Sequence, residues 1–167
     1  QVMKNFISHE NIALIVPRQT KDHLGCYITE FVCGHKTCSA YDVNTIFPVY
    51  VYNEEFGAEK QIPNYDLEII DKISKTSTVI VIAHRKSTIE SSKRLDIPFV
   101  SKRSNTDMSV FDAYDVFDYM FAIINSSVYK NEYQEFLKSD FPYIPYPRSL
   151  DYFRRISRYG KELRENQ

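Results

Sequence analysis

One stretch decides the fold: Ala113-Tyr-Asp-Val-Phe-Asp-Tyr-Met-Phe-Ala-Ile-Ile124. Its apolar side chains recur three or four residues apart, which places them along one wide face of an α-helix. The residues on this face are Val116, Phe117, Met120, Phe121, Ile123 and Ile124. We therefore predict a helix over residues 113–124 that buries this face against the rest of the chain.

The residues after this helix predict two more helices and an extended segment between them. Ser126 or Ser127 can cap a helix that continues to about Lys138. Residues 141–147, Phe-Pro-Tyr-Ile-Pro-Tyr-Pro, must be extended because proline fixes the backbone and removes a donor. Ser149 is predicted to cap a last helix. Its expected inward residues are Leu150, Phe153, Ile156, Tyr159 and Leu163.

The residues before residue 113 read mainly as β-strands. Apolar or alternating runs at 11–16, 27–32, 45–52 and 78–83 predict strands, with Pro48 at an edge, a bulge or a strand's start. Polar residues 53–64 predict a loop, residues 66–74 a helix capped by Asn64, and residues 97–100 a last extended piece. The expected fold is α+β.

We expect a single domain over residues 1–167, with a strand-rich part at 1–110 and a helical part at 111–167. The sheet is expected to be mixed and mainly antiparallel, in the N-terminal two thirds, with a helical C-terminal third. No apolar run approaches the roughly 20 residues of a membrane span. The chain opens on Gln1 without an apolar leader, so we expect a piece of a longer protein.

Three cysteines, Cys26, Cys33 and Cys38, lie close together in the sequence. An odd number without a secretion signal indicates reduced thiols and a cytoplasmic protein. With His23 and His35 these cysteines form the densest metal-like cluster. Their spacing does not match a zinc knuckle, so we expect chance proximity on neighbouring strands, with zinc as the alternative.

Charge is distributed unevenly along a chain whose net charge is −1. Residues 72–103 carry eight basic residues against Glu90 and Asp96. This stretch either follows a phosphate backbone or is an ordinary solvated face. Asp112, Asp115 and Asp118 can similarly be a cation site, although a solvated first helical turn, opposite the apolar face, explains them more simply.

Motifs of catalysis are absent from the sequence. It contains no P-loop, GxGxxG, GxSxG, HExxH or CxxC motif. It also lacks the glycine-rich cofactor loop and the Asn/Asp-Pro-Pro-Tyr/Phe tetrapeptide of adenine-N6 methyltransferases. His84, after the predicted strand at 78–83, has no evident catalytic partner. A small stand-alone enzyme is thus the least favoured of the hypotheses.

Several segments resemble one family in order and spacing. The first three are Asn11-Ile-Ala-Leu-Ile-Val-Pro-Arg-Gln19, Tyr27-Ile-Thr-Glu-Phe-Val32 and Ile46-Phe-Pro-Val-Tyr-Val-Tyr52. The last two are Tyr114-Asp-Val-Phe-Asp-Tyr-Met-Phe-Ala-Ile-Ile-Asn-Ser126 and Glu135-Phe-Leu-Lys-Ser-Asp-Phe-Pro-Tyr-Ile-Pro-Tyr-Pro147. They resemble the C-terminal specificity domain of type ISP and related type IIG bacterial restriction–modification enzymes. The resemblance does not extend to residues 75–94.

The resemblance implies a DNA target-recognition domain without a catalytic centre or cofactor of its own. Such domains choose the DNA sequence, while a neighbouring domain flips an adenine out and methylates N6 with S-adenosylmethionine. The expected partners are therefore double-stranded DNA and an upstream methyltransferase domain of the same polypeptide, and no membrane. The alternative is a protein-docking module that uses an exposed Tyr-Pro run at 141–147 and the aromatic helices.

Candidate DNA-binding residues follow from this implication. Arg18 and Gln19 come first because they follow a buried strand, and their side chains suit guanine and adenine edges, although the pair can instead be structural. Basic and polar residues in loops complete the set. These residues are Lys21, His35, Lys36, Thr37, Arg85, Lys86, Lys102 and Arg103.

Overall fold

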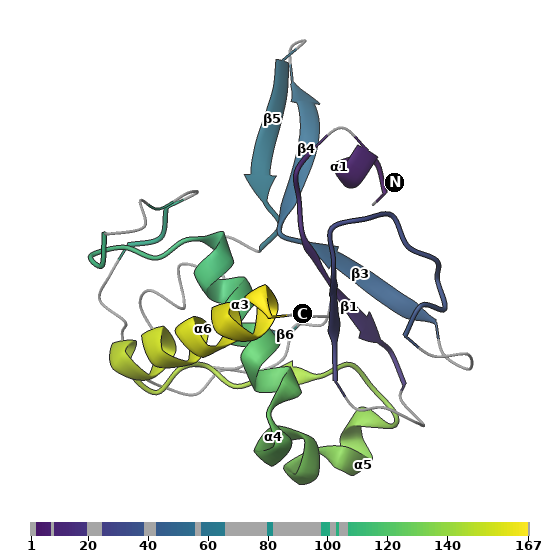
Figure 1. The fold of residues 1–167 in the computed structure, drawn as a ribbon, viewed down its shortest axis with the longest axis vertical. Coiled ribbons are helices and arrows are strands. Elements are labelled where there is room, and N and C mark those ends of the chain that lie inside the picture. The colour runs from purple at the N-terminus through teal and green to yellow at the C-terminus, as the bar shows by residue number, and fades with distance from the viewer. Residues whose placement is uncertain are drawn as a thin grey trace.

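The computed structural model of the chain describes residues 3–7, 9–19, 25–38, 43–55, 58–65, 80–81, 98–100, 103 and 107–166. Within these residues the fold is α+β, as predicted, with antiparallel strand pairs in the N-terminal part and helices in the C-terminal part (Figure 1). None of the helices in this part of the chain combines the length and apolar character needed to cross a membrane.

A three-stranded antiparallel sheet has the order β2-β1-β3. It consists of β1 (Ala13–Pro17), β2 (Tyr27–Thr29) and β3 (Asn44–Pro48). Every residue of the central strand β1 is buried, which explains its unbroken apolar sequence. The register of β1 and β3 pairs Pro17 with Asn44, so the C-terminal end of β1 lies beside the start of β3.

The predicted strand at 45–52 is two strands in different sheets. After β3 ends at Pro48, the chain turns at Val49, and β4 (Tyr50–Glu55) pairs with β5 (Ala58–Pro63). Asn11 fixes this turn, because its side chain donates to the Tyr50 carbonyl at 2.8 Å and accepts from the Tyr50 N–H at 3.3 Å. The predicted loop at 53–64 was therefore wrong. It is mostly a β-hairpin that projects away from α3 and α6, where polar residues are tolerated (Figure 1).

The predicted helix at 113–124 is confirmed as α3 (Ala113–Asn125). Asp112 caps it, since its carboxylate accepts hydrogen bonds from the N–H groups of Tyr114 and Asp115, and the Asp115 side chain accepts the Asp112 N–H in return. The last predicted helix is also confirmed, as α6 (Leu150–Glu165) with Ser149 as its N-cap.

Shorter elements complete the structure. The helix predicted from residue 126 or 127 to 138 is broken at Tyr133 into α4 (Ser127–Glu132) and α5 (Gln134–Leu137). Strands β6 (Ile80–Val81) and β7 (Tyr143–Ile144) form an antiparallel pair, and α1 (Lys4–Ile7) precedes β1. The predicted helix at 66–74 lies outside the described residues.

Helices α3 and α6 pack at very close range. A Cβ atom on Gly160 would collide with the backbone carbonyl of Asp118, so only glycine allows this approach. Ser157, also buried, donates from Oγ to the Asp115 carbonyl at 2.8 Å. Tyr159 was predicted to point inward but is 54% exposed, because the buried stripe of α6 runs through Phe153, Ser157 and Gly160 instead.

The aspartates of α3 are not a solvated face. Asp112 and Asp118 are buried, and the Asp118 carboxylate receives both Nε (2.7 Å) and Nη2 (3.0 Å) of Arg164. The prediction of a solvated turn was wrong because the partner of Asp118 lies 46 residues later in the sequence, on α6. This pair therefore joins α3 to α6. The largest fully buried side chains include Phe111, Phe117, Tyr119, Phe121 and Phe153.

Candidate nucleic-acid interface

Two of the predicted DNA-binding segments meet at one end of the three-stranded sheet. The N–H of Arg18, directly after β1, approaches the Val43 carbonyl at 3.5 Å. The N–H of Asn44, the first residue of β3, donates to the His35 carbonyl at 2.8 Å. Because Pro17 and Asn44 are register partners, the segment that follows β1 and the turn at 34–37 occupy the same end of the sheet.

Asn44 holds the turn at 34–37 in place. Its amide donates to the Gly34 carbonyl at 3.3 Å and accepts the Thr37 N–H at 2.7 Å, and the side chain is buried. Thr37 closes the turn by donating its hydroxyl to the Gly34 carbonyl at 2.7 Å. These hydrogen bonds fix the backbone of the turn. The exposed side chains of His35 and Lys36 are therefore attached to backbone of defined position.

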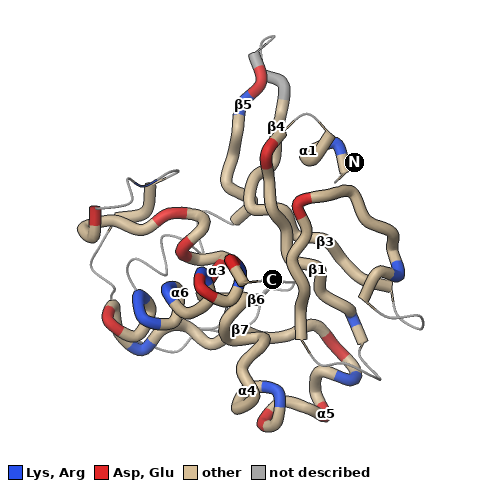
Figure 2. Tube along the Cα trace, in the orientation of Figure 1, with Lys and Arg blue, Asp and Glu red and all other residues tan. Residues whose placement is uncertain are grey.

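The side chains carried by these segments face solvent. Those of Arg18, Gln19, His35, Lys36 and Thr37 are all exposed, and we refer to these five residues as the sheet-end surface. The described segments that form it, residues 17–19, 33–38 and 43–44, contain no aspartate or glutamate (Figure 2). The surface therefore combines positive charge with polar groups suited to phosphates and base edges.

Helix α4 adds a basic residue that the sequence did not indicate. A Cβ on Gly25 would lie 3.0 Å from Nζ of Lys130 and 2.7 Å from Oδ1 of Asn125, so both side chains rest on the backbone just before β2. Gly25 also has a φ of 144°, which disfavours other residues. Lys130 thus lies at the start of β2, at the same end of the sheet as Arg18. It lies in a part of the sequence rich in acids, and only the fold brings it there.

Asn125 connects α3 to the sheet beside this surface. Its amide donates to the carbonyl (3.2 Å) and the thiol (3.3 Å) of Cys26, and accepts the Cys26 N–H at 3.4 Å. These contacts bring the C-terminal end of α3 against the N-terminal end of β2. The helical part of the chain therefore supports the surface directly.

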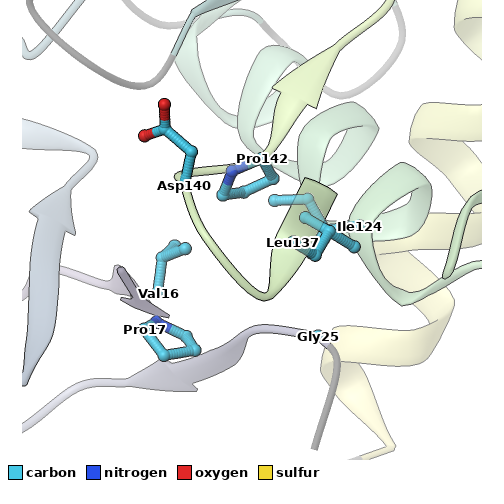
Figure 3. A pocket seen from close by; sticks show the side chains of 7 residues that line it. All are labelled: Val16, Pro17, Gly25, Ile124, Leu137, Asp140 and Pro142. Atoms are coloured by element: carbon cyan, nitrogen blue, oxygen red, sulfur yellow. The ribbon is translucent and has the colours of Figure 1, made fainter. Parts of the chain in front are cut away.

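A small cavity lies behind the end of β1 (Figure 3). It is lined by Val16, Pro17, Gly25, Ile124, Leu137, Asp140 and Pro142. Apart from Asp140 the lining is largely apolar, and the space is about that of one water molecule. This cavity is too small for a flipped base or a nucleotide cofactor.

Burial favours the neutral thiol form of two cysteines near the surface, Cys26 and Cys38. Burial strongly raises the pKa of Cys26, and partial burial raises that of Cys38 to about 11. Among the residues that the structure describes, no three His, Cys, Asp or Glu side chains are grouped as metal ligands, and His23 lies outside them.

Arg103, another predicted DNA-binding residue, is engaged inside the domain. Its Nη2 and Nε donate to the two carboxylate oxygens of Asp115 at 2.7 and 3.0 Å, and its Nη1 donates to the Asp107 carbonyl at 3.0 Å. The side chain is only 19% exposed. Arg103 therefore supports the start of α3 and does not belong to the sheet-end surface. Lys21, Arg85, Lys86 and Lys102 lie outside the described residues, as do His84 and most of the basic stretch at 72–103.

Comparison with known proteins gives one family. The whole chain, residues 1–167, matches the family described as Type ISP C-terminal specificity domain. No curated protein and no solved structure matches the chain. The family match rests on sequence and covers both the strand-rich and the helical part.

Proposed function

The chain belongs to the type ISP C-terminal specificity domains, and we propose that it binds double-stranded DNA and selects the sequence on which a restriction–modification enzyme acts. In this proposal the chain supplies recognition. An upstream domain of the same polypeptide supplies adenine-N6 methylation with S-adenosylmethionine. The observation that carries the proposal is the sheet-end surface, where the fold collects exposed basic and amide side chains from separate segments.

The chemistry of this surface suits a duplex. An arginine such as Arg18 can donate two hydrogen bonds to O6 and N7 of guanine, and a glutamine such as Gln19 can pair with N6 and N7 of adenine. Lys36 and Lys130 suit phosphates, which position a protein on DNA without specifying sequence. Base reading and phosphate binding are thus available side by side.

The rigidity of the supporting backbone favours specificity. Arg18 follows a strand that is buried along its whole length, and the turn at 34–37 is held by Asn44. A side chain that starts from a fixed backbone loses less conformational entropy on binding than one on a mobile loop. The surface can therefore discriminate between base pairs with few contacts.

The docking alternative loses its main support. The Tyr-Pro run at 141–147 was predicted to be exposed, but Pro142, Ile144 and Pro147 are buried. The hydroxyl of Tyr119 donates to the Pro145 carbonyl and that of Tyr129 to the Tyr143 carbonyl, each at 2.7 Å. The helices therefore bind the backbone of the run, which leaves Pro145 exposed and Phe141, Tyr143 and Tyr146 half-buried.

A salt series with duplex DNA tests the proposal. The affinity of the chain should fall as salt rises, with a contribution of about −0.9 to the slope of log K against log salt for each phosphate contact. Lys36→Ala should make the slope shallower by about one contact. Salt-independent binding, or no binding, would contradict the proposal.

A matched control separates the surface from net charge. The double variant Lys4→Gln/Lys60→Gln removes two positive charges in α1 and β5, away from the sheet-end surface. It should leave the slope unchanged. An equal loss in this control would show that overall charge, and not the sheet-end surface, determines binding.

A further inference from the structure

The outer face of α6 carries a second group of basic residues. Residues 152–161 contain Arg154, Arg155, Arg158 and Lys161 and no acid. Spacings of three and four residues place these side chains on one side of the helix. Phe153, Ser157 and Gly160, on the opposite side, are buried, and α6 packs against α3. Arg155, Arg158 and Lys161 are accordingly exposed, and Arg154, at the edge of this face, is half-buried.

The three arginines of this group differ from Lys161 and Arg164 on the same helix. Arg164 is bound to Asp118, and Lys161 lies 3.8 Å from Glu165. Among the residues that the structure describes, no carboxylate pairs with Arg154, Arg155 or Arg158. The Arg155 guanidinium lies 5.8 Å from the centre of the Tyr152 ring, a contact that leaves its charge and donors available.

The composition of this face favours a polyanion over a protein surface. The cores of protein–protein interfaces are depleted of charge, whereas surfaces that bind DNA are polar and strongly positive. The exposed part of α6 offers several cations, the acids Asp151, Glu162 and Glu165 toward its two ends, and a single large exposed ring, that of Tyr159. Guanidinium groups also fit phosphate oxygens with two parallel hydrogen bonds.

We infer that the face formed by Arg154, Arg155 and Arg158 is a second DNA contact, which binds phosphates without reading sequence. This inference rests on the proposal that the chain binds duplex DNA. Arg154 and Arg158 are separated by about 6 Å along the helix axis, and their long side chains can reach phosphates on either side of this span. The face can therefore contact neighbouring phosphates of one strand.

The position of α6 predicts which phosphates these are. Helix α6 packs across α3, and its basic segments appear on the left of Figure 2, with the three-stranded sheet on the right. The contacts should therefore fall on DNA that flanks the base pairs read by the sheet-end surface. A duplex trimmed to the base pairs read by the sheet-end surface should therefore lose the phosphate contacts of α6.

The test compares the 167-residue chain with its Arg155→Gln/Arg158→Gln variant on a long mixed-sequence duplex. The variant should weaken binding to preferred and scrambled sequences by the same factor, and its salt slope should be shallower by about 1.8, the value for two contacts. On the trimmed duplex the variant and the parent should bind alike. Arg155→Lys/Arg158→Lys, which keeps the charges, should retain the slope, and so should Lys4→Gln/Lys60→Gln. Circular dichroism checks that each variant is folded.

The outcomes separate this inference from the proposed function. If the folded glutamine variant keeps the slope of the parent while the parent binds DNA in a salt-dependent manner, the α6 contact is rejected and the proposed function stands. A loss limited to one preferred sequence would also reject it, because phosphate contacts do not distinguish bases. If the parent chain does not bind duplex DNA, both are rejected.

Discussion

Charged residues have opposite roles in the α3–α6 helix pair and at the sheet-end surface. Between the helices, Asp118 is buried and Arg164 binds it with two hydrogen bonds, so both charges are used within the fold. At the sheet end, Arg18 is exposed, and residues 17–19, 33–38 and 43–44 contain no acid, although Asp140 lines the cavity beside Pro17. An arginine that supports the fold is therefore distinguished from one that can recognise a ligand by its environment, and not by its presence in a basic stretch.

Removal of Arg164 should give the largest effect on stability. The Asp118 side chain is only 5% exposed, so Arg164→Met leaves a buried carboxylate without its partner. This change should lower the free energy of unfolding by about 3–5 kcal/mol. Urea unfolding at neutral pH measures the change. The exposed Arg158→Met on the same helix should change it by no more than about 0.5 kcal/mol. Equal losses would remove the distinction between the two kinds of arginine.

The loss in Arg164→Met should depend on pH. Burial already raises the pKa of Asp118, against the lowering effect of Arg164, and without Arg164 the pKa should rise further. A carboxyl group whose pKa is higher in the folded than in the unfolded state favours folding when it is protonated. The stability deficit should therefore shrink as pH falls through the folded-state pKa, and it should be full at neutral pH. A deficit that grows on acidification would contradict this account.

Gly160→Ala should separate the helices at their closest approach. The new methyl group would collide with the Asp118 backbone, and overpacking of this kind costs about 1–3 kcal/mol, even though alanine favours a helix by about 1 kcal/mol. Thermal or urea unfolding checks the prediction. Gly34→Ala is the matched control at the sheet end, since the nearest atom to a Cβ there, Thr37 Oγ1, lies 3.9 Å away. A harmless Gly160→Ala would mean that the helices pack less tightly than described.

Asn44→Ala should weaken DNA binding, although the Asn44 side chain is buried and does not face the DNA. It removes the two hydrogen bonds that hold the turn at 34–37, each worth about 1 kcal/mol, and should free His35 and Lys36 from their fixed positions. We expect a moderate loss of stability and a several-fold weaker affinity for DNA, measured by urea unfolding and by gel shift. Unchanged affinity in the folded variant would show that the turn does not take part.

Local sequence signals predicted the helices well. The apolar spacing at 113–124 and the N-cap Ser149 act within one or two helical turns, and both α3 and α6 are found where they indicate. The division of 45–52 at Val49 was missed because it depends on Asn11, which is 39 residues from Tyr50. Pairing of Asp118 with Arg164 is non-local in the same way.

The sheet-end surface could be predicted only in part. Arg18 and Gln19 are recognisable because they follow an apolar strand, and His35, Lys36 and Thr37 because they lie between two strands. That these groups meet depends on the β1–β3 register and on Asn44, which no local pattern reveals. Lys130 was missed because it reaches the same end of the sheet through the packing of α4 against the backbone at Gly25.

Selection of bound duplexes from a random pool is the most direct measure of sequence choice by this chain. The parent chain and Arg18→Ala should be compared after sequencing of the bound DNA. We expect the parent to enrich one defined motif, and the variant to tolerate other bases at a single position, with a loss of about 1–3 kcal/mol on the preferred duplex. Enrichment of no motif by the parent, or of an identical motif with unchanged affinity by the variant, would contradict the assignment of sequence recognition to the sheet-end surface.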